Sequence, residues 1–264
     1  MNTWAAYLLL GACAGLLAGL LGVGGGLVIV AVLARMLPAQ GVPADSVMHV
    51  ALATSLASII LTGLSSARSH HQRGSVLWTS VRWLVPGLVI GALLGSAVAS
   101  QLPAQFLRLA VALFCLLAAA QLAFGTPHRQ AAAMDPPRGR GLSLAGLAIG
   151  GLSAIVGIGG GSLTVPLLVW LGVTPVRAVG TSAACGVAIG LAAAVGYAAL
   201  TPTGSDLPSG SLGYVYLPAA AGIAVASILC APYGAKLAHR LSGPALKRVF
   251  AFLLLAVGVS LLWG

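Results

Sequence analysis

The chain has 264 residues, of which 59% are hydrophobic and 6% are charged. A soluble domain carries about 25% charged residues, so this composition excludes a water-soluble fold and predicts an integral membrane protein. The only acids are Asp45, Asp135 and Asp206, which excludes chemistry that needs two carboxylates in one site, such as glycoside hydrolysis. The net charge of +10 comes from short basic clusters between apolar runs, a pattern typical of cytoplasmic loops beside anionic lipids rather than of nucleic-acid binding.

The predicted elements, in chain order, are eight apolar stretches that we expect to be membrane helices. They cover residues 4–37, 47–66, 76–100, 103–124, 142–172, 178–200, 212–235 and 245–263. One long polar interruption, rich in proline and arginine, runs from Gly125 to Gly141. We therefore predict an all-α polytopic membrane protein with an N-terminal repeat at 1–125, a cytoplasmic linker at 126–141 and a C-terminal repeat at 142–264.

The stretches 4–37 and 142–172 are too long for a single straight span. No Asp, Glu, Lys, Arg or His occurs from Met1 to Ala34 or from Gly141 to Val176. A helix of that length would reach about 50 Å, whereas the hydrocarbon core is about 30 Å thick. Each stretch also has a glycine cluster near its middle, and each glycine costs a helix about 1 kcal/mol relative to alanine. We predict that each stretch forms two half-helices joined at a glycine turn, a re-entrant hairpin.

The basic loops support these hairpins. If all eight stretches crossed the membrane, the linker and the basic segment 236–248 would lie on opposite sides. If stretches 4–37 and 142–172 instead enter and leave on one side, the loop at 68–82, the linker, Arg177 and the segment 236–248 all lie in the cytoplasm. The positive-inside rule favours this second topology, which places both termini outside.

The two halves share landmarks in the same order. They are Gly-Val-Gly-Gly-Gly at 22–26 with Gly-Ile-Gly-Gly-Gly at 157–161, Ala-Thr-Ser at 53–55 with Gly-Thr-Ser at 180–182, Pro86 with Pro218, and Arg108 with Arg248. This order indicates an internal duplication. Because one hairpin plus three spans crosses the membrane an odd number of times, we predict two inverted repeats, each a re-entrant broken-helix hairpin followed by three transmembrane helices.

The glycine clusters are the first candidate substrate site. A helix broken within the membrane exposes unpaired N–H groups and the positive end of its dipole, and glycine lets a ligand approach the backbone closely, so a small anion is favoured. The predicted substrate-binding residues of this group are Gly24, Gly25, Gly26, Gly159, Gly160, Gly161 and the adjacent Ser162. The alternative role is helix packing, which fits the evenly spaced glycines at 11, 15, 19 and at 87, 91, 95 better than the consecutive triplets.

The hydroxyl pairs at the start of two later stretches are the second candidate group. Thr54 and Ser55 occupy places in the first half that Thr181 and Ser182 occupy in the second. Their alternative role is to bond back to carbonyls of their own helices. His49 and Arg177 lie nearly one turn before these pairs, and either is a candidate cation at the mouth of the site, although Arg177 would serve equally as a topology anchor.

At these residues the sequence resembles the TauE/SafE sulfite-exporter-like permeases. The resemblance rests on the motifs at 22–26, 53–55, 157–166 and 180–182 and on the His-His to Gly segment at 70–74, and it runs over essentially the whole chain. It implies transport of small sulfur-containing or organic anions, such as sulfite, sulfoacetate and other sulfonates, across the bacterial inner membrane.

The residues themselves predict a secondary transporter of a small anion, because inverted repeats with broken helices are typical of such proteins. An inside-negative potential would drive that anion outward, so we expect export. Two alternatives stay open: a passive anion channel lined by the broken helices, and an intramembrane hydrolase that uses Ser162 and His49. We predict no catalytic residue, metal or cofactor. The expected partners are the small anion and the lipid bilayer, without nucleic acid; the oligomeric state stays open, with a homodimer as one option.

Overall fold

The structure is a computed structural model, and it describes residues 3–22, 25–124, 135–202, 207–238 and 243–263. Within these ranges the chain is almost entirely helical, which confirms the predicted all-α class. The helices are α1 (Thr3–Leu21), α2 (Gly26–Met36), the 3-10 helix η1 (Pro38–Gln40), α3 (Val47–Gln72), α4 (Trp78–Ala99), α5 (Ala104–Phe124), α6 (Arg140–Val156), α7 (Gly161–Trp170), α8 (Pro175–Ala199), α9 (Leu217–Ala238) and α10 (Gly243–Leu262). A short antiparallel ribbon that the sequence did not predict, β1 (Ser211–Leu212) and β2 (Val215–Tyr216), precedes α9.

Six of the described helices are long and apolar enough to cross a membrane: α1, α3, α4, α5, α8 and α9. This confirms the prediction of a multi-pass protein. The longest are α3 with 26 residues and α8 with 25. At 1.5 Å per residue each exceeds the hydrocarbon core of about 30 Å, so their ends extend toward the headgroups.

The two overlong stretches are interrupted at their glycine clusters, as predicted. The first break separates α1 from α2, and the second separates α6 from α7. The glycine clusters lie near the middle of both apolar runs, but the arms differ in length, with 19 and 11 residues in the first stretch and 17 and 10 in the second. The short arms end early because Pro38 starts a 3-10 turn after α2 and Gly172 takes a φ of +85° after α7.

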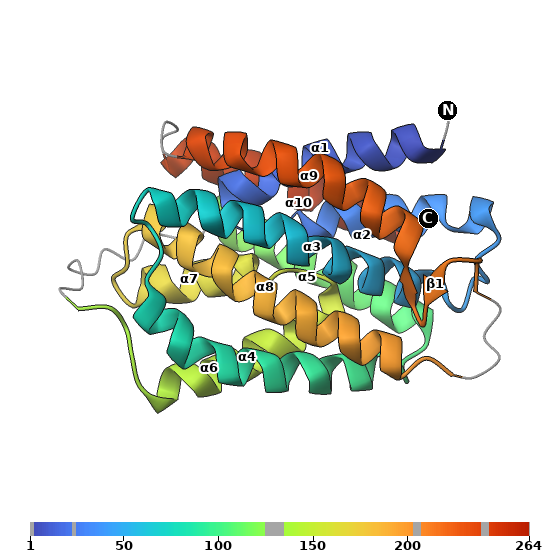
Figure 1. Cartoon of the computed structure of the whole chain (residues 1–264), viewed down its shortest axis with the longest axis horizontal. Helices are drawn as coiled ribbons and strands as arrows, with labels where there is room; N and C mark the ends of the chain where they lie inside the picture. The colour runs from blue at the N-terminus through green and yellow to red at the C-terminus, as the bar shows by residue number, and fades with distance from the viewer. Residues whose placement is uncertain (1–2, 23–24, 125–134, 203–206, 239–242, 264) are drawn as a thin grey trace.

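The two longest helices form the centre of the bundle (Figure 1). In the apolar windows of α3 and α8, 78% of the residues are buried, against 28% in α5. These central helices pack against each other, α3 also contacts α9, and α8 also contacts α4. Around them α1 packs along α9, α4 along α6, and α5 along α10. The Thr-Ser pairs at 54–55 and 181–182 therefore belong to the central pair of helices.

The evenly spaced glycines are packing positions, as their alternative role predicted. Gly11, Gly15 and Gly19 of α1 face the backbone of α9, and Gly87, Gly91 and Gly95 of α4 face that of α6. A Cβ atom on Gly15 would lie 2.5 Å from the carbonyl oxygen of Ser227, and one on Gly19 would lie 2.5 Å from the amide of Ala235. Such distances exclude any side chain, so glycine allows the two backbones to touch.

Figure 1 shows both chain termini at the same end of the bundle. The connections 37–46, 100–103 and 207–216 also lie at that end, and the connections 73–77, 135–139 and 171–174 lie at the opposite end. One predicted landmark is not matched in position, because Pro86 lies well inside α4 whereas Pro218 is at the start of α9.

Candidate functional site

The two helix breaks have the same local backbone geometry. Four glycines take left-handed conformations there: Gly22, Gly25, Gly157 and Gly160, with φ of 69°, 68°, 77° and 77°. Side chains rarely adopt such angles, so glycine is required at each position. Gly25 and Gly160 are the N-caps of α2 and α7. Gly24, a predicted site residue, lies outside the described residues.

The first break contacts the second break directly. A Cβ atom on Gly26 would collide with the carbonyl oxygen of Gly157 and would lie 2.8 Å from Cδ1 of Ile59. A Cβ atom on Gly157 would lie 2.6 Å from Cδ2 of Leu52 and 2.7 Å from Cγ2 of Val30. The start of α2 and the end of α6 can therefore approach each other only because both positions are glycine.

Two buried serines bond the breaks to the central helices. The hydroxyl of Ser55 on α3 lies 3.1 Å from the carbonyl oxygen of Gly26 and 3.0 Å from that of Gly157, so its proton is shared between them. Ser182 on α8 donates a hydrogen bond of 3.1 Å to the carbonyl oxygen of Gly22. Each serine thus bonds the glycine that ends the interrupted helix in the other half of the chain.

The neighbouring threonines stabilise the starts of two other helices. Thr54 accepts a hydrogen bond of 3.0 Å from the amide of Tyr216, just before α9, and Thr181 accepts one of 3.0 Å from the amide of Leu77, just before α4. Thr181 also donates to the carbonyl oxygen of Arg177 at 2.7 Å. All four predicted hydroxyls are buried and bonded to protein groups in this conformation.

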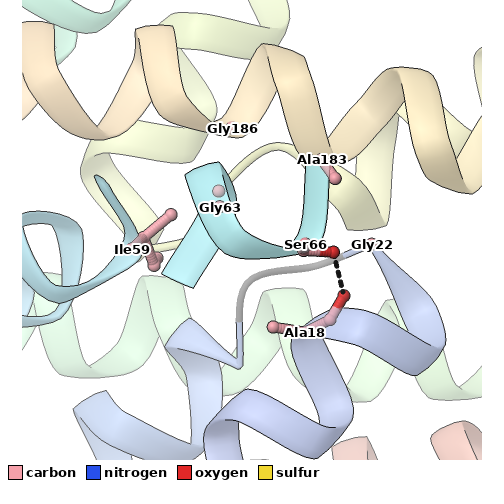
Figure 2. A pocket seen from close by; sticks show the side chains of 8 residues that line it. Ala18, Gly22, Ile59, Gly63, Ser66, Ala183 and Gly186 are labelled. Carbon is pink, nitrogen blue, oxygen red and sulfur yellow. Dashed lines mark hydrogen bonds between the residues drawn. The ribbon is translucent and has the colours of Figure 1, made fainter. Parts of the chain in front are cut away.

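A narrow crevice lies between the breaks and the central helices (Figure 2). Its empty space is about 200 Å³, and at no point is it wide enough for a water molecule. Ala18 and Gly22 of the first half, Gly159 of the second, α3 residues Ile59, Gly63 and Ser66, and α8 residues Ala183 and Gly186 line it. Figure 2 shows Ser66 directed at Ala18, whose carbonyl oxygen it approaches to 3.4 Å.

Three hydroxyls near the second break were only partly foreseen. Ser162, in the first turn of α7, was predicted as a site residue, and its buried hydroxyl has no hydrogen-bond partner among the described residues. The same holds for Ser153 in the last turn of α6 and Thr164 in α7. The glycine motif did not single out these two. A comparison of the two halves would have singled them out, because the equivalent positions in the first half are Ala18 and Ile29.

His49 lies at the start of α3, away from the hydrogen bonds that join the breaks. Its Nε2 lies 3.0 Å from the carbonyl oxygen of Leu102, its Nδ1 lies 3.2 Å from that of Asp45, and its ring stacks on Tyr214 at 4.9 Å between centroids. Arg177 is exposed near the start of α8. Neither side chain forms a hydrogen bond with the glycine clusters in the described ranges.

The site contains hydrogen-bonding groups but little charge. No Asp or Glu lies within a described helix, since Asp45 precedes α3 and Asp135 precedes α6. In the part of the chain that the structure describes, no three His, Cys, Asp or Glu side chains are grouped to hold a metal ion. Outside the spans, burial raises the pKa of Tyr214, which stacks on His49.

Comparison with known proteins shows membrane transporters as relatives of the chain. Residues 7–261 match the family described as "Sulfite exporter TauE/SafE". A "Probable membrane transporter protein" of Haemophilus influenzae is 34% identical over 254 residues, which cover 96% of each chain. One of Methanocaldococcus jannaschii is 24% identical over 256 residues, or 97% of this chain and 94% of the relative. "Probable membrane transporter protein YunE" of Bacillus subtilis is 31% identical over 66% of this chain and 70% of its own. No solved structure matches the chain significantly.

Proposed function

The chain belongs to the TauE/SafE sulfite exporter family of membrane transporters, and from that premise we propose that it exports a small sulfur-containing anion, sulfite or an organosulfonate, by alternating access. It is a multi-pass membrane protein and not an enzyme. The anionic substrate follows from the helix breaks, and the sulfur chemistry follows from the family.

One observation carries the proposal: the breaks of the two halves meet within the bundle, where Ser55 lies between the carbonyls of Gly26 and Gly157. A hydrogen bond and a glycine contact join the two interrupted helices, which supports a single site that both helices share. At each break the first two amides of the short helix precede its first hydrogen bonds, which the following amides donate to the carbonyls of Gly25 and Gly160. Such leading amides attract an anion. A site shared by both halves can face either side of the membrane when one half moves against the other.

The proposed architecture is a pair of inverted repeats in which α1 to α5 correspond to α6 to α10. The packing supports this correspondence, because each of three helix pairs has an equivalent pair when the two halves are exchanged. The packing of α1 on α9 corresponds to that of α6 on α4, and the packing of α3 on α9 to that of α8 on α4. Likewise, α2 packs on α3 as α7 packs on α8. In Figure 1 the ends of α1 and α2 that lie away from their break are at the end of the bundle with the chain termini. The corresponding ends of α6 and α7 are at the opposite end of the bundle. Two re-entrant hairpins that open to opposite sides account for both features.

The charge distribution supports a cytoplasmic assignment for the end away from the termini. By position in the chain, the connections and helix ends there carry Arg68, Arg73, Arg82, Arg138, Arg140, Arg177 and Lys236. The end with the termini carries Arg35 and Arg108. This asymmetry fits the positive-inside rule with both termini outside.

Within this site we assign substrate contact to the glycine clusters at 24–26 and 159–161 and to Ser162. The hydroxyls of Thr54, Ser55, Thr181 and Ser182 join the halves in the present conformation. His49 and Arg177, near the helix starts, are proposed to act on the approach to the site. The narrow crevice supports a carrier rather than a channel, since an open pore would admit water along its length.

The deciding experiment is uptake of labelled sulfite, sulfate, thiosulfate and sulfoacetate into proteoliposomes that contain the purified protein. We expect saturable flux of at least one of these anions that empty liposomes lack, and accumulation against its gradient when a membrane potential is imposed. Flux that only equilibrates would indicate the channel instead. No flux of any of these anions would contradict the proposed substrate class.

A further inference from the structure

The second break differs from the first in its unsatisfied hydroxyls. Ser153 and Thr164 are fully buried, and the hydroxyls of Ser153, Ser162 and Thr164 have no hydrogen-bond partner among the described residues. Native proteins leave few buried polar groups without a partner, because a buried unpaired hydroxyl is destabilising. Three such groups within one helix interruption indicate that something else supplies their partner.

Two of these hydroxyls, those of Ser153 and Thr164, lie beside the N-terminus of α7. Gly160 is its N-cap, and the position that a Cβ atom would take on Gly160 lies 3.4 Å from Oγ1 of Thr164 and 3.7 Å from Oγ of Ser153. Ser162 belongs to the first helical turn, and its amide and that of Gly161 precede the first bonds of the helix, which Leu163 and Thr164 donate to the carbonyl oxygen of Gly160. Hydroxyls and amides therefore surround the positive end of a helix of 10 residues.

Among the residues that the structure describes, the first break offers no such hydroxyl. Alignment of the two glycine clusters places Ala18, Leu27 and Ile29 where the second half has Ser153, Ser162 and Thr164. The polar groups beside the end of α1 are bonded: Ser66 approaches the carbonyl oxygen of Ala18 at 3.4 Å, and Nε2 of His70 lies 3.1 Å from that of Gly19. The two breaks thus have the same backbone geometry but different chemistry.

Each of the unpartnered hydroxyls at the second break can donate a hydrogen bond to a ligand. Three carbonyls at the end of α6 already accept hydrogen bonds, among them that of Ser153 from the amides of Gly157 and Ile158 and that of Ala154 from the hydroxyl of Tyr197. The carbonyl of Gly157 accepts from Ser55. With these acceptors occupied and the helix dipole positive toward the site, the three hydroxyls suit an anion better than a metal cation.

We propose that the second break supplies the side-chain ligands of the transported anion, namely the hydroxyls of Ser153, Ser162 and Thr164 beside the amides that start α7, while the first break adds backbone contacts only. This inference rests on the proposed function. The segment from Gly141 to Val176, which carries these hydroxyls, contains no charged residue to compensate a ligand, and the desolvation energy of an ion rises steeply with its charge. The site therefore selects singly charged oxyanions, such as hydrogensulfite or a sulfonate, over the sulfate dianion.

The test measures concentration-dependent uptake in proteoliposomes for Ser153→Ala and Thr164→Val. Both changes remove a hydroxyl at nearly constant shape. The matched control is Ser58→Ala, because Ser58 is equally buried but its hydroxyl bonds the carbonyl of Thr54 in its own helix. We expect the KM for the transported anion to rise about tenfold to a hundredfold in each variant, as for loss of a hydrogen bond to a charged group. The control variant should change the KM by less than about twofold, which corresponds to under about 0.5 kcal/mol.

Competition completes the test. In the unaltered protein, excess methanesulfonate should inhibit uptake more strongly than excess sulfate. In Thr164→Val the two anions should inhibit uptake equally. If the unaltered protein transports an anion but both variants behave like Ser58→Ala, the inference is wrong and the proposed function stands. If a variant alters sodium dependence at constant KM, the hydroxyls bind a cation and the inference is also wrong. If the unaltered protein neither transports nor is thermally stabilised by any of these anions, the proposed function itself fails.

Discussion

Ser182 donates a hydrogen bond of 3.1 Å to the carbonyl oxygen of Gly22, a residue 160 positions earlier in the chain. Ser55 makes the equivalent bond in the opposite direction, to Gly157 at 3.0 Å. The two serine bonds therefore connect the end of each interrupted helix to a central helix from the other half. They stabilise the packing of one half on the other at the level of the breaks.

Removal of either serine hydroxyl should destabilise the folded protein. For Ser182→Ala we expect a loss of about 1 kcal/mol, or about 2–4 °C in Tm, because the carbonyl of Gly22 loses a partner in an environment without water. Ser55→Ala should cost more, since Ser55 contacts two carbonyls. Thermal unfolding in detergent measures both, with Ser58→Ala as the control. Equal Tm values for Ser182→Ala and Ser58→Ala would show that the bond contributes nothing.

A substitution at the second break should impair transport more than its cost in stability explains. Gly160→Ala forces alanine into a φ of +77°, which costs about 1–2 kcal/mol. Gly74→Ala introduces the same strain at a φ of +68°, but its Cβ atom would lie in open space between α3 and α4. The added Cβ atom at position 160 would also displace Cδ1 of Ile189, so we expect Gly160→Ala to lose somewhat more Tm than Gly74→Ala. Only Gly160→Ala should lose most of its initial flux. Equal flux in Gly160→Ala and Gly74→Ala would show that Gly160 has a purely structural role.

The glycine contact between α4 and α6 should be essential for folding. A Cβ atom on Gly91 would collide with the carbonyl oxygen of Leu147, so Gly91→Ala must separate the two helices. Gly141 lies on α6 with nothing within 4 Å of its Cβ position, and Gly141→Ala should be neutral or stabilising by up to about 1 kcal/mol through helix propensity. The yield of monodisperse protein after detergent extraction checks the pair. Normal yield of Gly91→Ala would contradict the close packing.

The proposed topology predicts which exposed positions a membrane-impermeant thiol reagent can reach in cells. In a background without Cys13, Cys115, Cys185 and Cys230, Gln101→Cys should react from outside. Asp135→Cys and Thr174→Cys flank the hairpin of α6 and α7, and both should react only after the membrane is opened. All three positions are exposed in the folded chain. Labelling of positions 135 and 174 from opposite sides would rule out the second re-entrant hairpin and the inverted repeat with it.

Transport should follow the membrane potential without a sodium or proton gradient. Coupled carriers commonly place a carboxylate at membrane depth, and no described helix contains one. A potential of 100 mV contributes about 2.3 kcal/mol to the movement of one charge, so a potassium diffusion potential should set the direction of flux in proteoliposomes.

His49→Ala tests the main alternative source of coupling. Both ring nitrogens of His49 face backbone carbonyls, so we expect this variant to lower the yield but to keep the response to potential. Flux that follows a pH gradient, ignores the potential and disappears in His49→Ala would identify His49 as a proton-coupling residue.

The positions of the breaks could be predicted from sequence because they depend on a local property. Only glycine accepts the positive φ found at Gly22, Gly25, Gly157 and Gly160. The lengths of the two helices on either side of each break could not be predicted from the length of the apolar run alone. Leu37 and Leu171 continue the apolar runs, but Pro38 and Gly172 end the helices beside them.

The partners of the site residues depend on contacts between distant parts of the chain. The sequence marked Ser55 and Ser182 as equivalent hydroxyls, but their bonds to Gly157 and Gly22 required the packing of the halves. Ser153 and Thr164 were missed because a hydroxyl in an apolar helix usually bonds its own backbone. The difference between Thr164 and Ile29 was visible in the aligned halves, but its meaning required the unpartnered hydroxyl.

The packing of α1 along α9 has a consequence for biogenesis. The glycine face of α1 contacts residues such as Ile223 and Ala231, which the ribosome adds long after α1 has entered the membrane. Until then that face has only lipid or insertion machinery beside it, and the carbonyl of Gly22 lacks the hydroxyl of Ser182. The N-terminal half therefore remains an incompletely packed intermediate in the bilayer until α8 and α9 have been translated. The last third of the chain completes the packing around α1.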